Sequence, residues 1–182
     1  MKTVLFDLDG TLLPMEQDVF TKAYFGALSK KLAPQGYEPK TLISAVSKSV
    51  DAMVANDGKD TNENVFWHVF ADILGERVLD DKKYFDEFYK VEFNGLKAMS
   101  GFNEKAGATV KAVKARGCKV VVATNPVFPI TAQENRLRFA GVDLRDVDYI
   151  TSYENSHFCK PNTRYYTYFF GVIGCTGNDV WL

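Results

Sequence analysis

The chain has 182 residues, of which 46% are hydrophobic, and its 22 basic residues nearly balance its 23 acidic ones. This length and composition allow one folded domain, or one domain with a sizeable insertion. The charge is balanced and the sequence has no basic run. Both features argue against nucleic acid or a membrane surface as a partner. No apolar stretch approaches the length of a membrane span, and three scattered cysteines indicate neither a disulfide framework nor a zinc site. We therefore expect a globular cytoplasmic protein.

The first predicted element is a short buried strand that leads directly into two carboxylates. Residues 3–6 are rich in β-branched and aromatic side chains, and Asp7 and Asp9 follow at the strand's carboxyl end. Open α/β sheets place their ligands at that end. Two acids this close repel each other unless a cation, a lysine or a shared proton compensates, so the pair indicates a metal-assisted site. The simpler alternative is an ordinary Asp-Gly turn, and because Gly10 permits a sharp bend, the relation of the two acids stays open.

Asp7-Leu8-Asp9-Gly10-Thr11-Leu12, placed after an apolar amino-terminal strand, resembles the first motif of the haloacid dehalogenase (HAD) superfamily of phosphohydrolases. The resemblance implies that Asp7 attacks phosphorus to form an aspartyl-phosphate. It implies that Asp9 protonates the leaving group and then activates water. It also implies a Mg²⁺ cofactor, with Asp7 contributing its side chain and Asp9 its backbone carbonyl as metal ligands. The residues alone do not tell the nucleophile from the acid.

The part of the chain after this motif is predicted to be helical. Apolar residues recur at helical spacing in consecutive segments, with no convincing strand between them. We expect these helices at residues 15–32, about 42–54, 64–74 and 82–93. Their position resembles that of the helical cap that many HAD hydrolases carry, and we assign residues 16–94 to such a cap domain. The aromatic residues of this segment, Trp67 among them, are expected to form its core. The polar residues 56–64 are either a specificity loop or, as we prefer, a solvated linker.

The remainder of the chain alternates between helix and strand. We expect helices at residues 103–116, 130–139 and 163–173, and strands at residues 119–124, 148–152 and 180–182. Such alternation favours a parallel sheet with right-handed crossovers. The sequence therefore predicts an α/β fold, a Rossmann-like parallel sheet with an inserted α-helical cap. Its discontinuous core comprises residues 1–15 and 95–182.

Two further motifs follow in this second half. Thr124 ends a strand and resembles the superfamily's second motif, a Ser or Thr whose hydroxyl contacts phosphate, and Asn125 would add an amide donor or a backbone contact. Lys160, directly before Pro161, resembles the third motif, whose ammonium offsets the aspartates and the phosphoryl group. Taken alone, these residues would be a solvated strand-end threonine and a solvated loop lysine. In this context we predict that Thr124, Asn125 and Lys160 bind the substrate.

The fourth motif of the superfamily, one or two more acids after an apolar strand, is not evident. Gly177-Asn178-Asp179 follows what is predicted to be the end of a helix rather than a strand. Val180-Trp181-Leu182 is the better strand candidate, so we expect the missing acids just beyond it. On this interpretation the α/β core lacks its C-terminal part.

The function that the resemblance implies is a Mg²⁺-dependent phosphatase for a small phosphorylated metabolite. Its catalytic residues would be Asp7, Asp9, Thr124 and Lys160. Two alternatives stay open, a sugar-phosphate mutase and a non-catalytic binding protein with an incomplete metal site. A dehalogenase is disfavoured, because dehalogenases of this superfamily generally lack the second aspartate. Neither the identity of the substrate nor the oligomeric state can be read from the sequence.

Overall fold

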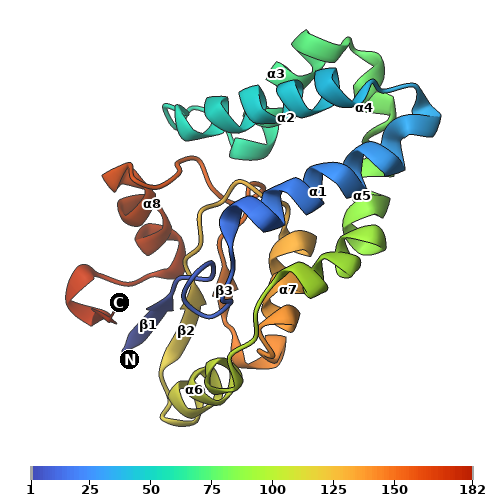
Figure 1. The fold of residues 1–182 in the computed structure, drawn as a ribbon. Coiled ribbons are helices and arrows are strands. Elements are labelled where there is room, and N and C mark those ends of the chain that lie inside the picture. Colours follow the sequence, from blue (N-terminus) through green and yellow to red (C-terminus); the bar gives the residue numbers. More distant parts are fainter. Residues whose placement is uncertain (1, 182) are drawn as a thin grey trace.

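The computed structural model describes residues 2–181 and has a parallel four-stranded sheet with the order β3-β2-β1-β4 (Figure 1). The strands are β1 (Thr3–Phe6), β2 (Lys119–Val122), β3 (Tyr149–Ile150) and β4 (Val180–Trp181). In the register of the two central strands, Phe6 lies opposite Val122, so both strands end at the same level. The side chains that follow these two strands therefore meet at one edge. The predicted α/β fold with a parallel sheet is confirmed, and of the predicted last strand only Leu182 lies outside the described residues.

Helices cover both faces of the sheet, as expected for parallel strands (Figure 1). They are α6 (Glu104–Ala115), α7 (Ile130–Phe139) and α8 (Thr163–Ile173). The side chains of β2 alternate between the two faces. Val120 and Val122 belong to the same apolar cluster as residues of α6 and α7, whereas Val121 and Ala123 pack with α8. Helices α7 and α8 agree with the approximate ranges 130–139 and 163–173 that the sequence predicted.

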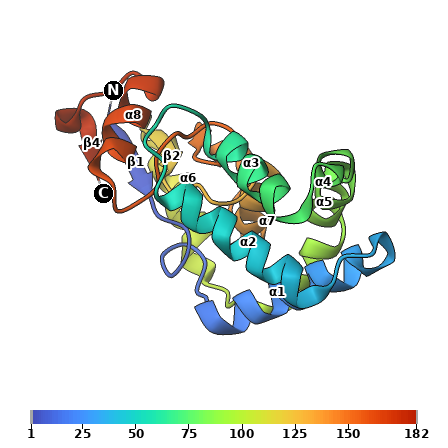
Figure 2. The same ribbon diagram turned by 90° about the horizontal axis from the view of Figure 1, so that it is seen from above.

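A helical segment lies between β1 and α6, and in it α2 and α3 run side by side over the rest of the molecule (Figure 2). It contains α1 (Gln17–Leu32), η1 (Ala33–Gln35), α2 (Pro39–Val54), α3 (Asn62–Leu74), α4 (Arg77–Asp80), α5 (Lys82–Lys90) and η2 (Glu92–Met99). The helix predicted at residues 82–93 ends early, at Lys90. Its carbonyl accepts a 2.8 Å hydrogen bond from the side chain of Asn94, which competes with continued helix formation.

Aromatic rings join this helical segment to the α/β part. Tyr24 of α1 packs edge-on against Phe128, with ring centroids 5.5 Å apart, and Phe93 stacks on Phe139 of α7 at 6.2 Å. One apolar cluster consequently runs from the sheet into the helical segment. The division into a core and a cap at residues 16–94 stays a prediction. No helix within residues 2–181 is both long and apolar enough to cross a membrane.

The segment between α2 and α3 is held against the α/β part. Asn62 is fully buried, and its amide nitrogen donates to the carbonyl oxygen of Pro126 at 3.2 Å and to Sγ of Cys159 at 3.3 Å. Its amide oxygen accepts from Asn56 at 2.9 Å, and its backbone N–H donates to the carbonyl of Ser156 at 2.8 Å. The expectation of a solvated linker therefore fails at the buried Asn56 and Asn62, whereas Asp57, Lys59 and Asp60 are exposed as expected. These bonds fix the segment to the loop that carries Lys160.

Candidate active site

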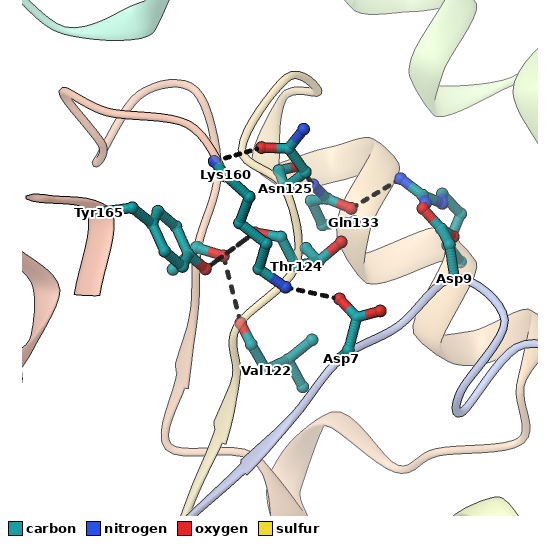
Figure 3. Close-up of polar contacts among 10 residues, drawn as sticks. Asp7, Asp9, Val122, Thr124, Asn125, Gln133, Lys160 and Tyr165 are labelled. Atoms are coloured by element: carbon teal, nitrogen blue, oxygen red, sulfur yellow. Dashed lines mark hydrogen bonds and ion pairs between the residues drawn. The ribbon is translucent and has the colours of Figure 1, made fainter. Parts of the chain in front are cut away.

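The loop after β1 is a tight turn that holds the two aspartates apart. The carbonyl of Leu8 accepts from the N–H of Leu13 at 2.9 Å, and the N–H of Gly10 donates back to the Leu13 carbonyl at 2.9 Å. Gly10 has φ 74°, in the left-handed region that favours glycine. The buried side chains of Leu8 and Leu13 anchor the turn. As a result the carboxylates of Asp7 and Asp9 point in different directions (Figure 3).

Lys160 lies beside the first aspartate. Its Nζ donates to Oδ1 of Asp7 at 2.9 Å, and its backbone N–H donates to the side-chain oxygen of Asn125 at 3.1 Å (Figure 3). The ammonium also lies 5.8 Å from the ring centroid of Tyr165. Because the Asp7 side chain is 43% exposed, its carboxylate stays accessible to a ligand. The structure thus brings Asp7, Asn125 and Lys160 together, as the sequence predicted.

Thr124 is fixed through its backbone. Its carbonyl oxygen accepts from the Thr151 hydroxyl at 2.7 Å and from the Tyr165 hydroxyl at 2.9 Å. Burial raises the pKa of Tyr165 well above its usual range, so the phenol remains a neutral donor. Among residues 2–181, no hydrogen bond uses the Thr124 hydroxyl. That hydroxyl is therefore unpaired at the carboxyl edge of β2, where the residue is 1% exposed.

Arg136 of α7 is a site residue that the sequence analysis missed. It is 1% exposed, and its Nη2 contacts Oδ2 of Asp9. Its Nη1 donates to the side-chain oxygen of Gln133 at 2.9 Å, and Gln133 in turn donates to the backbone carbonyl of Asn125 at 3.4 Å. The guanidinium also covers the ring of Phe128 at 5.0 Å. Asn125 consequently contacts Lys160 directly and is linked to Arg136 through Gln133.

The sequence did contain a signal for this arginine. Arg136 follows Ala132 by four residues and precedes Ala140 by four, which places it on the apolar face of the predicted helix. An arginine on a buried face requires a partner of opposite charge. The pattern could have indicated a buried acid near α7, but it could not have named Asp9.

Each aspartate therefore has its own cation, Lys160 for Asp7 and Arg136 for Asp9. The spacing in the sequence left open how the two carboxylates are arranged relative to each other. In the structure they neither share a proton nor face each other. A cation bound at Asp7 would add to a site that is already balanced in charge.

The oxygen atoms here fit a hard divalent cation. The half-exposed Asp7 carboxylate offers Oδ2, and within the described part of the chain no hydrogen bond ends on the backbone carbonyl of Asp9. Mg²⁺ takes few protein ligands and keeps several waters, so one carboxylate and one carbonyl suit it. Residues 2–181 contain no cluster of three or more His, Cys, Asp or Glu side chains that could hold a metal by themselves.

A family model identifies the family to which this chain belongs. A family model described as haloacid dehalogenase-like hydrolase matches residues 1–181. The chain belongs to this HAD-like hydrolase family. Membership makes the protein a hydrolase by class. None of the curated proteins is a significant match by sequence.

Solved structures agree with the fold of this HAD-like hydrolase. A predicted phosphoglycolate phosphatase from Haemophilus somnus 129pt is 18% identical with a TM-score of 0.50, covering 99% of this chain and 75% of that one. A HAD phosphatase from Thermococcus onnurineus is 16% identical with a TM-score of 0.50 and the same coverage, 99% and 75%. L-2-haloacid dehalogenase from Xanthobacter autotrophicus is 18% identical with a TM-score of 0.49, covering 99% and 68%. At these identities the likeness to the two phosphatases concerns the fold alone.

Proposed function

We propose that this HAD-like hydrolase is a Mg²⁺-dependent phosphatase that cleaves a small phosphate monoester through an aspartyl-phosphate. One observation carries the proposal: the Lys160 ammonium lies 2.9 Å from the Asp7 carboxylate, at the sheet edge where Thr124 presents a free hydroxyl. A nucleophilic oxygen, a cation and a hydroxyl donor around one accessible point are what phosphoryl transfer requires.

In the first step, a carboxylate oxygen of Asp7 attacks phosphorus, and the bond between phosphorus and the leaving oxygen breaks. Lys160 and the Thr124 hydroxyl hold the phosphoryl oxygens, and the Asn125 amide adds a donor. Because Lys160 is anchored by its backbone bond to Asn125, its ammonium is positioned before the substrate arrives. Mg²⁺, held by the Asp7 side chain and the Asp9 carbonyl, would neutralise negative charge on the phosphoryl group.

Asp9 supplies the proton for the leaving oxygen and later removes one from water. Its Oδ2 is occupied by Arg136, whereas its Oδ1 has no hydrogen-bond partner within residues 2–181. Oδ1 is therefore the atom that we assign to proton transfer. In the second step, water attacks phosphorus, Asp9 accepts its proton, and the bond to Asp7 breaks to release phosphate.

The test is release of inorganic phosphate from a panel of phosphate monoesters, with Mg²⁺ and with a chelator. We expect Mg²⁺-dependent release that Asp7→Asn lowers by at least about 1,000-fold, since the nucleophile is lost. Asp18→Asn, which removes an exposed acid from the first turn of α1, is the matched control and should keep wild-type activity. Acid-quenched protein should carry a phosphoryl group on the peptide that contains Asp7.

The alternatives give different results in the same assay. A sugar-phosphate mutase would interconvert sugar phosphates without releasing phosphate in proportion. A binding protein would bind phosphate esters but leave them intact, and Asp7→Asn would then change nothing that the assay measures. Phosphate release by Asp7→Asn at the wild-type rate would contradict the proposed nucleophile.

A further inference from the structure

A cavity of about 340 Å³ opens between the helical segment and α7, and both Asp9 and Arg136 lie in its wall. Helices α1, α2, α3 and α5 line it together with the chain between β2 and α7. Aromatic side chains are the most frequent kind in the lining, among them Phe20, Tyr24, Phe66, Trp67, Phe85 and Phe128. The expected core position of Trp67 is confirmed, since it is buried within the apolar cluster, and the residue also lines the cavity.

Among the residues that line this cavity, Asp9, Trp67 and Arg136 each have a buried polar atom without a partner within residues 2–181. Within residues 2–181, Nε of Arg136 and Oδ1 of Asp9 are buried and make no hydrogen bond. Arg136 is 1% exposed, so leaving its Nε donor unsatisfied carries a free-energy cost. A ligand oxygen would accept a hydrogen bond from Nε of Arg136, and from Oδ1 of Asp9 only when that atom carries the proton assigned to it.

We propose that this cavity binds the leaving group of the substrate, a proposal that rests on the phosphatase function. The substrate is then a phosphate monoester of an alcohol with a large apolar, aromatic body. Asp9 is the residue assigned to protonate the leaving oxygen. The rest of the alcohol must extend from that oxygen, and the cavity is the space that opens beside Asp9.

The size and the charge of the cavity narrow the class of alcohol that it can hold. Its volume is roughly twice the ~150 Å³ of an engineered apolar cavity that admits benzene, so a two-ring aromatic group fits. Among the described residues of the lining, Arg136 is the only lysine or arginine, and Asp9 already balances its charge. A second anionic group on the alcohol would find no free cation there. The lining, which also includes the Asp51 carboxylate, therefore disfavours phosphorylated acids and favours an aromatic body without negative charge.

The experiment compares primary alkyl phosphates whose leaving oxygens are chemically alike. We expect kcat/KM for 2-(1-naphthyl)ethyl phosphate to exceed that for ethyl phosphate and for phosphoglycolate by at least about 100-fold, since even one buried methylene changes it by about 10-fold or more. Equal values across the series would overturn the substrate class while leaving the phosphatase function intact. No phosphate release from any ester would instead count against the phosphatase function.

A binding measurement tests, without turnover, whether the cavity holds the aromatic group. Calorimetric titration uses 3-(1-naphthyl)propylphosphonate, in which a methylene replaces the ester oxygen, against propylphosphonate. We expect at least about 100-fold tighter binding of the naphthyl compound and a more negative heat-capacity change, the mark of apolar burial. Equal affinities would overturn the proposal.

Two serines of α2 offer a matched pair of variants. Ser47 lines the cavity, whereas Ser44, exposed on the same helix, does not. Ser47→Phe should weaken binding of the naphthyl phosphonate at least about 10-fold relative to Ser44→Phe, because the added ring takes up cavity volume. Equal affinities of the two folded variants would place the ligand outside the cavity.

Discussion

Asp9 and Arg136 form an ion pair across 127 positions of the sequence, between the turn after β1 and the buried face of α7. The pair directs the second carboxylate away from the first, which contacts Lys160. It also ties the turn to a helix that borders the cavity. A single buried arginine thus determines the orientation of Asp9 and part of the wall beside it.

Replacing this arginine should destabilise the protein strongly. We expect Arg136→Met to lower the free energy of unfolding by about 3 kcal/mol, because it leaves Asp9 and Gln133 without their buried donor. Arg138→Met, two positions along the same helix at an exposed site, should change it by less than about 1 kcal/mol. Urea unfolding followed by circular dichroism measures both. Equal effects would mean that the Arg136 pair contributes no more than a surface contact.

The hydroxyl of Thr124 should matter for activity and not for stability. Its backbone carbonyl, not its hydroxyl, makes the structural hydrogen bonds, so Thr124→Val should unfold near the wild-type temperature. If the phosphatase proposal holds, kcat should fall about 100-fold, the typical loss of one donor to a developing negative charge. Thr124→Ser keeps the donor and should retain most of the activity. Steady-state kinetics of Thr124→Val and Thr124→Ser decide this, and equal activity of the two would remove the hydroxyl from the mechanism.

The buried amide of Asn62 should stabilise the contact between the helical segment and the Lys160 loop. Asn62→Ala removes hydrogen bonds to Pro126, Cys159 and Asn56. We expect a loss of about 2 to 3 kcal/mol, since buried partners are left unsatisfied. Asn64→Ala, which removes only an exposed bond to Asp60, should cost less than about 1 kcal/mol.

Hydrogen exchange locates the same effect. In Asn62→Ala, the amides of residues 56–64 and 153–160 should exchange faster, while those of α8 should not. Uniform acceleration over the whole chain would indicate global destabilisation instead of a local contact.

Stability should decline in alkali. Burial raises the pKa of Tyr24 to about 12 from 10.0, and it raises the pKa of the Cys159 thiol to about 12 from 9.0. Between pH 9 and 12 the unfolded chain therefore binds fewer protons than the folded one, so the free energy of unfolding falls as pH rises. This contribution is fully present below pH 9. Urea titrations from pH 8 to 11 should show the fall, and in Tyr24→Phe the fall above pH 10 should be shallower. A free energy of unfolding that is constant up to pH 11 would contradict the assigned burial.

Much of the fold was readable in the sequence, because local patterns specify it. The run of β-branched residues predicted β2, the first motif placed two acids at the end of β1, and the helix start signal at Pro161 and Asn162 predicted α8. Where a side chain competed with the backbone, as Asn94 does at the end of α5, the periodicity extended the helix too far.

The sequence by itself determined which residues reach the carboxyl edge of the sheet, since that depends on where each strand ends. Only the tertiary structure decided which cation meets which acid, because Lys160 and Arg136 lie 153 and 127 positions from their partners. It also decided that Asn62 is buried and that aromatic residues of the helical segment enclose a cavity beside Asp9. Such contacts depend on how whole helices pack against the sheet, and residue spacing along the chain carries no record of that packing.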